Sequence, residues 1–209
     1  MTSIASSVIL VTAHPILVGP ISHFFFKERL SYLNTIGIFL SVGGVIILVL
    51  GNFTQEKMTL QGNLLALLGG IAAGLYILGG RKMRKTVSVT SYAVVVYGVC
   101  AIALCALCLL FNAPLYHLRT TDYELIFLMA LISGIFGHTL YNYVLKHIRA
   151  SVASVALLGE PFGSTLLAIA IPQIHQIPSI YTLLGGVVIL LGVYFTAKNT
   201  MKPDLLETF

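Results

Sequence analysis

The chain has 209 residues, of which 57% are hydrophobic and only 9% are charged. A soluble globular domain carries roughly 25% charged residues, so this composition excludes an ordinary soluble domain and indicates a polytopic membrane protein. The formal net charge of +5 does not call for a nucleic-acid partner, because basic residues of membrane proteins mostly lie at their cytoplasmic edges.

Seven apolar segments follow one another along the chain, each of about the 20 residues that cross a bilayer. Lipid offers the backbone no hydrogen-bond partner, and the segments do not alternate as barrel strands do, so all seven are predicted to be helices. The predicted fold class is an all-α, polytopic membrane protein. Its predicted spans are Ile4–Phe26, Leu33–Leu50, Leu60–Gly80, Ser91–Phe111, Tyr123–Leu145, Ala150–Ile171 and Ser179–Ala197.

The first span, Ile4–Phe26, follows Met1 almost directly and has no basic residue before it. A cleavable signal peptide would begin with positive charge, so we do not expect one. Small polar residues near its start suit contact with other helices better than contact with lipid: Ser3, Ser6, Ser7 and Thr12. This pattern favours further helices ahead of the first span.

The distribution of basic residues predicts the orientation. Ten of the 12 lysines and arginines lie in the turns after the first, third and fifth spans and in the C-terminal tail, whereas the opposite turns hold only Lys57 and Arg119. The positive-inside rule then places the C-terminus in the cytoplasm and the N-terminus outside. In the first of the basic turns, Lys27, Glu28 and Arg29 are interpreted as an interface anchor and topology signal, with a role in gating as the alternative.

The sixth span carries a carboxylate, Glu160, and a helix breaker, Pro161, at its middle. A charge at the bilayer centre costs at least ~2.5 kcal/mol on insertion scales, and such residues are mostly functional. The first span has the same plan, because small polar residues lead to His14 and Pro15 at mid-span. Both prolines, Pro15 and Pro161, are predicted to interrupt their helices.

These two spans lie five helices apart and therefore cross the membrane in opposite directions. Each precedes a glycine-rich helix, with GGVIIL from Gly43 and GGVVIL from Gly185. Inverted repeats with interrupted helices are a common design of secondary transporters. The predicted organisation is the last two helices of a first repeat in 1–52, a complete five-helix second repeat in 59–198 and a cytoplasmic tail in 199–209. A complete five-plus-five bundle would have ten helices.

The segments HPILVGPISHFFFKERLSYLNTIGIFLSVGGVIIL and SVASVALLGEPFGSTLLA resemble the EamA-type branch of the drug/metabolite transporter superfamily. The KERLS turn at Glu28 and the GEP element at Gly159 to Pro161 are similar to paired signatures of that family. The resemblance implies a permease that moves a small metabolite, amino acid or drug across the plasma membrane by alternating access. Two features depart from it: the family's first three helices are absent, and the counterpart of the KERLS turn, IPQIHQIPS, holds His175 and no acidic residue.

The candidates for substrate binding or coupling are the polar residues inside the predicted spans: His14, His138, Asn142 and Glu160. From the helical rise of ~1.5 Å per residue, His138 lies about 12 Å and Glu160 about 16 Å from their shared turn, so the two side chains could meet. Asn142 at i+4 and Gly134 at i−4 from His138 would share one helical stripe. Glu160 would bind a cation or amine or carry a proton; alternatively it is a hydrogen-bonded residue of the bundle, as either histidine could be.

Other functional classes fit less well. No Walker sequence is present, so a gradient or exchange would drive transport. A seven-helix receptor is the alternative that the span number suggests, but the last span has no lysine for a retinal Schiff base. No HExxH motif points to an enzyme, so we expect no catalytic residue, cofactor or metal. A transporter fragment without activity of its own stays open. The expected partners are a small-molecule substrate, the lipid bilayer and either preceding helices or a second copy, and no nucleic acid.

Overall fold

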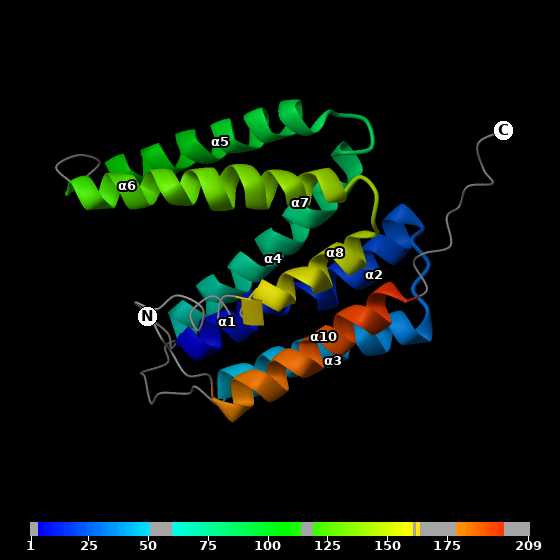
Figure 1. The fold of residues 1–209 in the computed structure, drawn as a ribbon. Helices are drawn as coiled ribbons and strands as arrows, with labels where there is room; N and C mark the ends of the chain where they lie inside the picture. The colour runs from blue at the N-terminus through cyan, green and yellow to red at the C-terminus, as the bar shows by residue number, and fades with distance from the viewer. Residues whose placement is uncertain (1–3, 51–59, 114–118, 161, 164–178, 199–209) are drawn as a thin grey trace. The chain divides into compact units, whose positions relative to one another are not determined.

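A computed structural model describes residues 4–50, 60–113, 119–160, 162–163 and 179–198 of the chain. Every regular element in these ranges is a helix (Figure 1). Six helical stretches of 18 to 25 residues are long and apolar enough to cross a membrane, and a shorter apolar stretch covers Ala150–Gly159. The rest of the predicted sixth span lies outside the described residues. The all-α, polytopic membrane fold is therefore confirmed.

The observed helix ends lie within three residues of the predicted ones wherever both are described. The first span is two helices, and the fifth is α-helix, π-helix and α-helix in succession. The elements are α1 (Ile4–Thr12), α2 (His14–Phe26), α3 (Tyr32–Leu50), α4 (Leu60–Met83), α5 (Val89–Leu110), α6 (Thr120–Met129), η1 (Ala130–His138), α7 (Thr139–Val144), α8 (Ala150–Ala156), η2 (Leu157–Gly159) and α10 (Ile180–Ala197).

Two helices begin with a serine whose side chain binds a free backbone amide. The Ser88 Oγ accepts a hydrogen bond from the Ser91 N–H at 3.1 Å at the start of α5. The Ser179 Oγ accepts one from the Thr182 N–H at 3.2 Å at the start of α10. A helix start leaves four amides without an intrahelical partner, and a serine at this position satisfies one of them. The local sequence therefore fixes where both spans begin.

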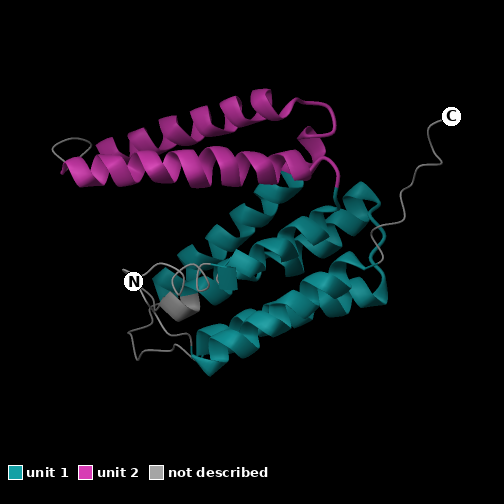
Figure 2. Ribbon diagram, viewed as in Figure 1, with its two compact units in different colours: residues 1–79, 148–209 teal, residues 80–147 magenta. Residues whose placement is uncertain are grey.

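The described helices form two compact units (Figure 2). Unit 1 comprises residues 1–79 and 148–209, and unit 2 comprises residues 80–147. Unit 1 thus takes α1, α2 and α3 from the first predicted repeat and, from the second, α8, η2, α10 and the part of α4 up to Gly79. The repeat boundaries at 1–52 and 59–198 stay a prediction, and the predicted tail at 199–209 lies outside the described residues.

In unit 1, α3 and α10 lie side by side and antiparallel (Figure 1). A Cβ atom at Gly44 would lie 2.8 Å from the Gly185 carbonyl oxygen, and one at Gly37 would lie 2.6 Å from the Gly192 carbonyl oxygen. These contacts are seven residues, two helical turns, apart on both helices. The backbones touch because these positions lack side chains, which is how membrane helices associate when lipid supplies no hydrophobic drive.

Polar groups add to the same pair. Asn34, which is 1% exposed, donates its amide to the Thr196 carbonyl oxygen at 2.6 Å. The Ser41 Oγ donates to the Ile189 carbonyl oxygen at 3.4 Å. These hydrogen bonds join the same two antiparallel helices that the glycines bring into contact, and the inverted repeat stays a prediction.

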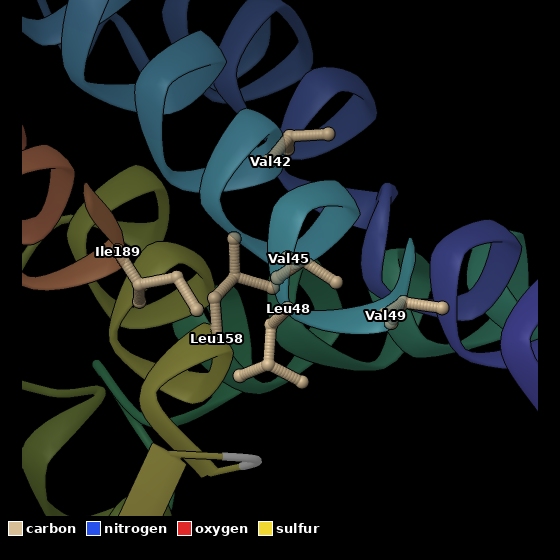
Figure 3. Packing of buried hydrophobic residues seen from close by; sticks show 6 residues of the cluster. All are labelled: Val42, Val45, Leu48, Val49, Leu158 and Ile189. Atoms are coloured by element: carbon tan, nitrogen blue, oxygen red, sulfur yellow. The ribbon is translucent and has the colours of Figure 1, made fainter. Parts of the chain in front are cut away.

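The hydrophobic core of unit 1 surrounds this pair. Figure 3 shows residues of α3 packed against Leu158 of η2 and Ile189 of α10, both fully buried. The α3 members of the cluster are Val42, Val45, Leu48 and Val49. The core therefore fixes the short helical segment directly before Glu160 against the glycine-packed pair.

Candidate functional site

The first predicted span is interrupted at its middle. α1 ends at Thr12 and α2 begins at His14, with Ala13 in a turn between them. Pro15 has no amide hydrogen, so it cannot donate to the carbonyl four residues earlier, that of Val11. The His14 Nδ1 lies 3.0 Å from this Val11 oxygen and donates a hydrogen bond to it. The imidazole therefore replaces the backbone donor that the proline removes.

The other ring nitrogen of His14 is available for a further role. His14 is 7% exposed, and its Nε2 is buried without a hydrogen bond to any described residue. The backbone of Ser154 in α8 lies near the ring. His14 thus combines a structural hydrogen bond with one buried nitrogen at the place where α2 packs against α8.

A cavity of about 310 Å³ lies between the interrupted span and α4. Its volume is at the lower end of the range for small-molecule sites. His14 is the one polar residue among those that line it, and the others are Leu10, Ala13, Ile16, Leu17, Leu67, Gly70 and Ile71. The glycine matters to this wall, because a Cβ atom at Gly70 would lie 2.7 Å from the Leu10 carbonyl oxygen.

Glu160 follows a second departure from α-helical geometry. α8 ends at Ala156, and the 3₁₀-helix η2 occupies Leu157–Gly159 directly before the glutamate. The Glu160 side chain is exposed, and it makes no hydrogen bond to a described residue. Pro161 lies outside the described residues, so the predicted interruption there stays a prediction. The carboxylate is thus placed at the end of a short helix whose Leu158 is anchored in the core.

In unit 2, the predicted stripe on the fifth span does not follow α-helical spacing. Residues from Ala130 to His138 form a π-helix, η1, whose wider turn breaks the i, i+4 register between Gly134 and His138. His138 is exposed, whereas Asn142 is buried. The prediction that the two share one face with Gly134 is therefore wrong for this segment, because it assumed unbroken α-helix.

The Gly134 carbonyl oxygen of the π-helix accepts the Thr139 backbone N–H and is also within hydrogen-bond distance of two side chains. The Tyr97 hydroxyl of α5 donates to the Gly134 carbonyl oxygen at 3.0 Å, and the Thr139 Oγ1 lies 3.3 Å from the same oxygen. π-Helical turns are rare and are frequently found at functional sites. From sequence, Tyr97 is a residue that either lines a cavity or packs between helices, and its hydroxyl joins α5 to the π-helical segment.

Two arginines interpreted from sequence as topology signals have a structural role in unit 2. Arg84 is 3% exposed and its Nε donates to the Asn142 carbonyl oxygen at 2.9 Å. The Arg81 Nη1 donates to the carbonyl oxygens of Leu145 at 2.9 Å and Lys146 at 2.7 Å. Basic side chains bind the free carbonyls at a helix C-terminus and oppose its negative dipole end. The basic turn at residues 81–85 therefore caps α7.

Glu28 corrects the interpretation of the KERLS turn as an interface anchor. The side chain is 8% exposed, and its Oε2 accepts a hydrogen bond from the Ala150 N–H, at the start of α8, at 2.9 Å. The Arg149 Nη1 donates to the Arg29 carbonyl oxygen at 2.9 Å. A buried carboxylate needs such partners, since burial without them is costly. The turn is therefore bonded to another helix.

The predicted residues are distributed over both units. His14 and Glu160 belong to unit 1, whereas His138 and Asn142 belong to unit 2. The pairing of His138 with Glu160 thus stays a prediction. Among the described residues, no group of three His, Cys, Asp or Glu side chains could hold a metal ion.

Comparison with known proteins assigns this chain to a family of membrane proteins. Residues 60–198, well over half of the chain, match the EamA-like transporter family. The chain belongs to that family. The resemblance drawn from the KERLS and GEP segments is therefore confirmed, and the protein is a multi-pass membrane protein of a transporter family.

Relatives of this EamA-like protein agree with that conclusion. It is 23% identical to the uncharacterized transporter YyaM of Bacillus subtilis (strain 168), in a match that covers 99% of this chain and 68% of the relative. It is 27% identical to the uncharacterized transporter YdfC of the same organism, over 94% of this chain and 63% of the relative. An uncharacterized transporter of Archaeoglobus fulgidus is 25% identical over 91% of this chain and 67% of its own length.

A solved crystal structure shows the same fold. It matches with a TM-score of 0.74 at 21% identity, over 94% of this chain and 68% of that one. The EamA-like chain thus spans about two thirds of the length of the proteins that it matches.

Proposed function

We infer that this EamA-like chain forms most of a secondary transporter that moves a small metabolite, amino acid or drug by alternating access. The observation that carries the proposal is Glu160, an acidic side chain in an apolar, span-length segment, directly after the 3₁₀-helix that follows α8. Carboxylates inside membranes mark ion and substrate pathways, and interrupted helices form the binding sites of many secondary transporters.

The first span supports the same reading of the mechanism. It is interrupted next to His14, as α8 is interrupted next to Glu160, and α3 and α10 pack as antiparallel counterparts. In the proposed mechanism the two repeats rock about a midplane site and expose it to each side in turn. Glu160 would bind an amine or cation or carry the coupling proton, and His14, His138 and Asn142 would complete the polar lining. The proposed membrane is the plasma membrane, with the N-terminus outside and the C-terminus in the cytoplasm.

The test is substrate counter-flow with the purified protein in liposomes. The probes are the radiolabelled proteinogenic amino acids and the lipophilic cation tetraphenylphosphonium. We expect Glu160→Gln to reduce transport of any accepted probe to background at unchanged protein abundance, because the amide keeps the size and loses the charge. Glu124→Gln, at an exposed carboxylate of α6, is the control and should transport normally.

Each outcome of this experiment has a separate meaning. Normal counter-flow by Glu160→Gln rejects the role of the carboxylate but leaves transport established. The second outcome is that the unaltered protein transports none of these probes and binds them no differently from Glu160→Gln. Transport of these substrate classes by this chain alone is then rejected.

A further inference from the structure

The KERLS turn and the start of α8 are joined by two hydrogen bonds that run in opposite directions. The Glu28 carboxylate accepts from the Ala150 amide at 2.9 Å, and the Arg149 guanidinium donates to the Arg29 carbonyl at 2.9 Å. The residues of these bonds lie 122 and 120 positions apart in the chain. This pair of bonds, which we term the 28–150 clasp, is built into the contact between α2 and α8.

The clasp is a built feature of the contact between these segments. Glu28 is 8% exposed, and Ala150 is fully buried. The turn that carries Glu28 is itself ordered, since the Glu28 N–H donates to the Ser22 carbonyl oxygen at 3.3 Å and the His23 Nδ1 lies 3.1 Å from the Glu28 carbonyl oxygen. A carboxylate at a helix start binds a free amide and faces the positive end of the helix dipole. The position of Glu28 is therefore fixed by hydrogen bonds within its own turn as well as by the bond to α8.

The two sides of the clasp belong to different predicted repeats. Glu28 lies in the repeat at 1–52 and Ala150 in the repeat at 59–198, and both turns are among the basic turns predicted to face the cytoplasm. When two repeats rock about a central site, groups that join them at one face of the membrane must separate as that face opens. A hydrogen bond to a charged group would stabilise the state in which the cytoplasmic side is closed.

We propose that the 28–150 clasp is the lock that holds the cytoplasmic side of the transporter closed, and that it breaks in each cycle when this side opens. The inference rests on the proposed function. It makes Glu28 a positioning residue that acts on the α8 segment leading to Glu160. Substrate contacts belong to other residues, so loss of the clasp changes how often the cytoplasmic side is open.

The test measures the access of a reagent to the buried start of α8. Ser151, which is 1% exposed, is replaced by cysteine in the full chain after the three native cysteines have been changed to alanine. A membrane-impermeant maleimide is added in vesicles to the face that carries Lys27. We expect Glu28→Ala to raise the labelling rate of Ser151→Cys at least about tenfold, and Glu28→Gln, which keeps a neutral acceptor, to raise it less. Lys27→Gln, in the same turn but exposed, is the matched control and should leave the rate unchanged.

A second experiment keeps Glu28 intact. It distinguishes a contact that opens during the cycle from a helix cap that stays closed throughout. Arg29→Cys and Arg149→Cys are joined by a short bifunctional maleimide, and the excess reagent is quenched. Ser151→Cys is then labelled in the cross-linked protein. This variant lacks the Arg149 bond and keeps the bond between Glu28 and Ala150, so a lower labelling rate after cross-linking than in the same variant without cross-linker shows that the contact opens while Glu28 is present. An unchanged rate in the cross-linked protein, or in Glu28→Ala, overturns the proposal.

The labelling needs no substrate, so it is independent of the counter-flow test. Labelling that responds as expected in a protein that transports none of the probes would reject transport of these substrate classes by the chain alone and leave the opening contact established. Transport that persists at full rate in the fully cross-linked protein would reject the lock and leave the transporter established.

Discussion

At the scale of single residues, the first span shows how a proline and a histidine can form one structural element. Pro15 deprives the Val11 carbonyl of its helical donor, and the His14 Nδ1 supplies another at 3.0 Å. A histidine inside a membrane span is commonly interpreted as functional. Here half of its hydrogen-bonding capacity serves the helix, while the buried Nε2 stays available at the α2–α8 contact.

This pairing predicts a coupling between two substitutions. His14→Leu should lower the free energy of unfolding by about 1–3 kcal/mol, because the partly buried Val11 carbonyl is left without a donor. In a Pro15→Ala background the alanine N–H can donate to Val11, so the same His14→Leu change should cost much less. Thermal unfolding in detergent of the wild type, both single variants and the double variant measures the coupling energy, for which we expect at least about 0.5 kcal/mol. Equal costs in the two backgrounds would show that His14 does not act through Val11.

At the scale of helices, the glycine pairs of the sequence turn out to be unequal. Each GG pair permits close approach on paper, but helix geometry turns neighbouring residues to different faces. Gly44 touches the backbone of α10, whereas nothing described lies within 4 Å of a Cβ atom built at Gly43. On α4, a Cβ atom at Gly70 would lie 2.7 Å from the Leu10 carbonyl oxygen, while the nearest atom to one at Gly69 is 3.6 Å away, on Val11. The sequence alone therefore does not predict which glycine of a pair contacts another helix, because this depends on where the partner helix lies.

A matched pair of alanine substitutions follows from this difference. Gly44→Ala should destabilise the protein by about 1–3 kcal/mol, because its methyl group would lie 2.8 Å from the Gly185 carbonyl oxygen and the helices would have to separate. Gly43→Ala should be neutral or stabilise by up to about 1 kcal/mol through the lower backbone entropy of the unfolded chain. Unfolding of both variants in detergent, followed by circular dichroism, compares them. Equal losses at the two positions would contradict the packing of α3 on α10.

At the scale of the whole molecule, hydropathy alone was enough to predict the helices, since a bilayer permits few alternatives to an apolar helix of that length. It was not enough to predict the contacts. Glu28 and Arg84 look like ordinary residues of basic turns, and their burial depends on backbone groups of distant helices, Ala150 and Asn142. No sequence pattern in this apolar segment predicts the π-helix before Thr139 either. Candidate residues could be named from their depth, whereas their partners depend on tertiary structure.

The orientation drawn from the basic residues is a property of the entire chain and can be tested as such. Single cysteines at Lys27, Lys82 and Lys198, all exposed in the structure, should react with a membrane-impermeant maleimide from the same face, because the positive-inside rule assigns their turns and tail to the cytoplasm. A cysteine at Arg119, also exposed, should react from the opposite face. Right-side-out and inside-out vesicles of the same cells provide the two faces, and labelling after detergent lysis gives the total for each variant. Reaction of Lys27→Cys and Lys82→Cys from different faces would break the threading of the first three spans, and with it the inverted arrangement on which alternating access depends.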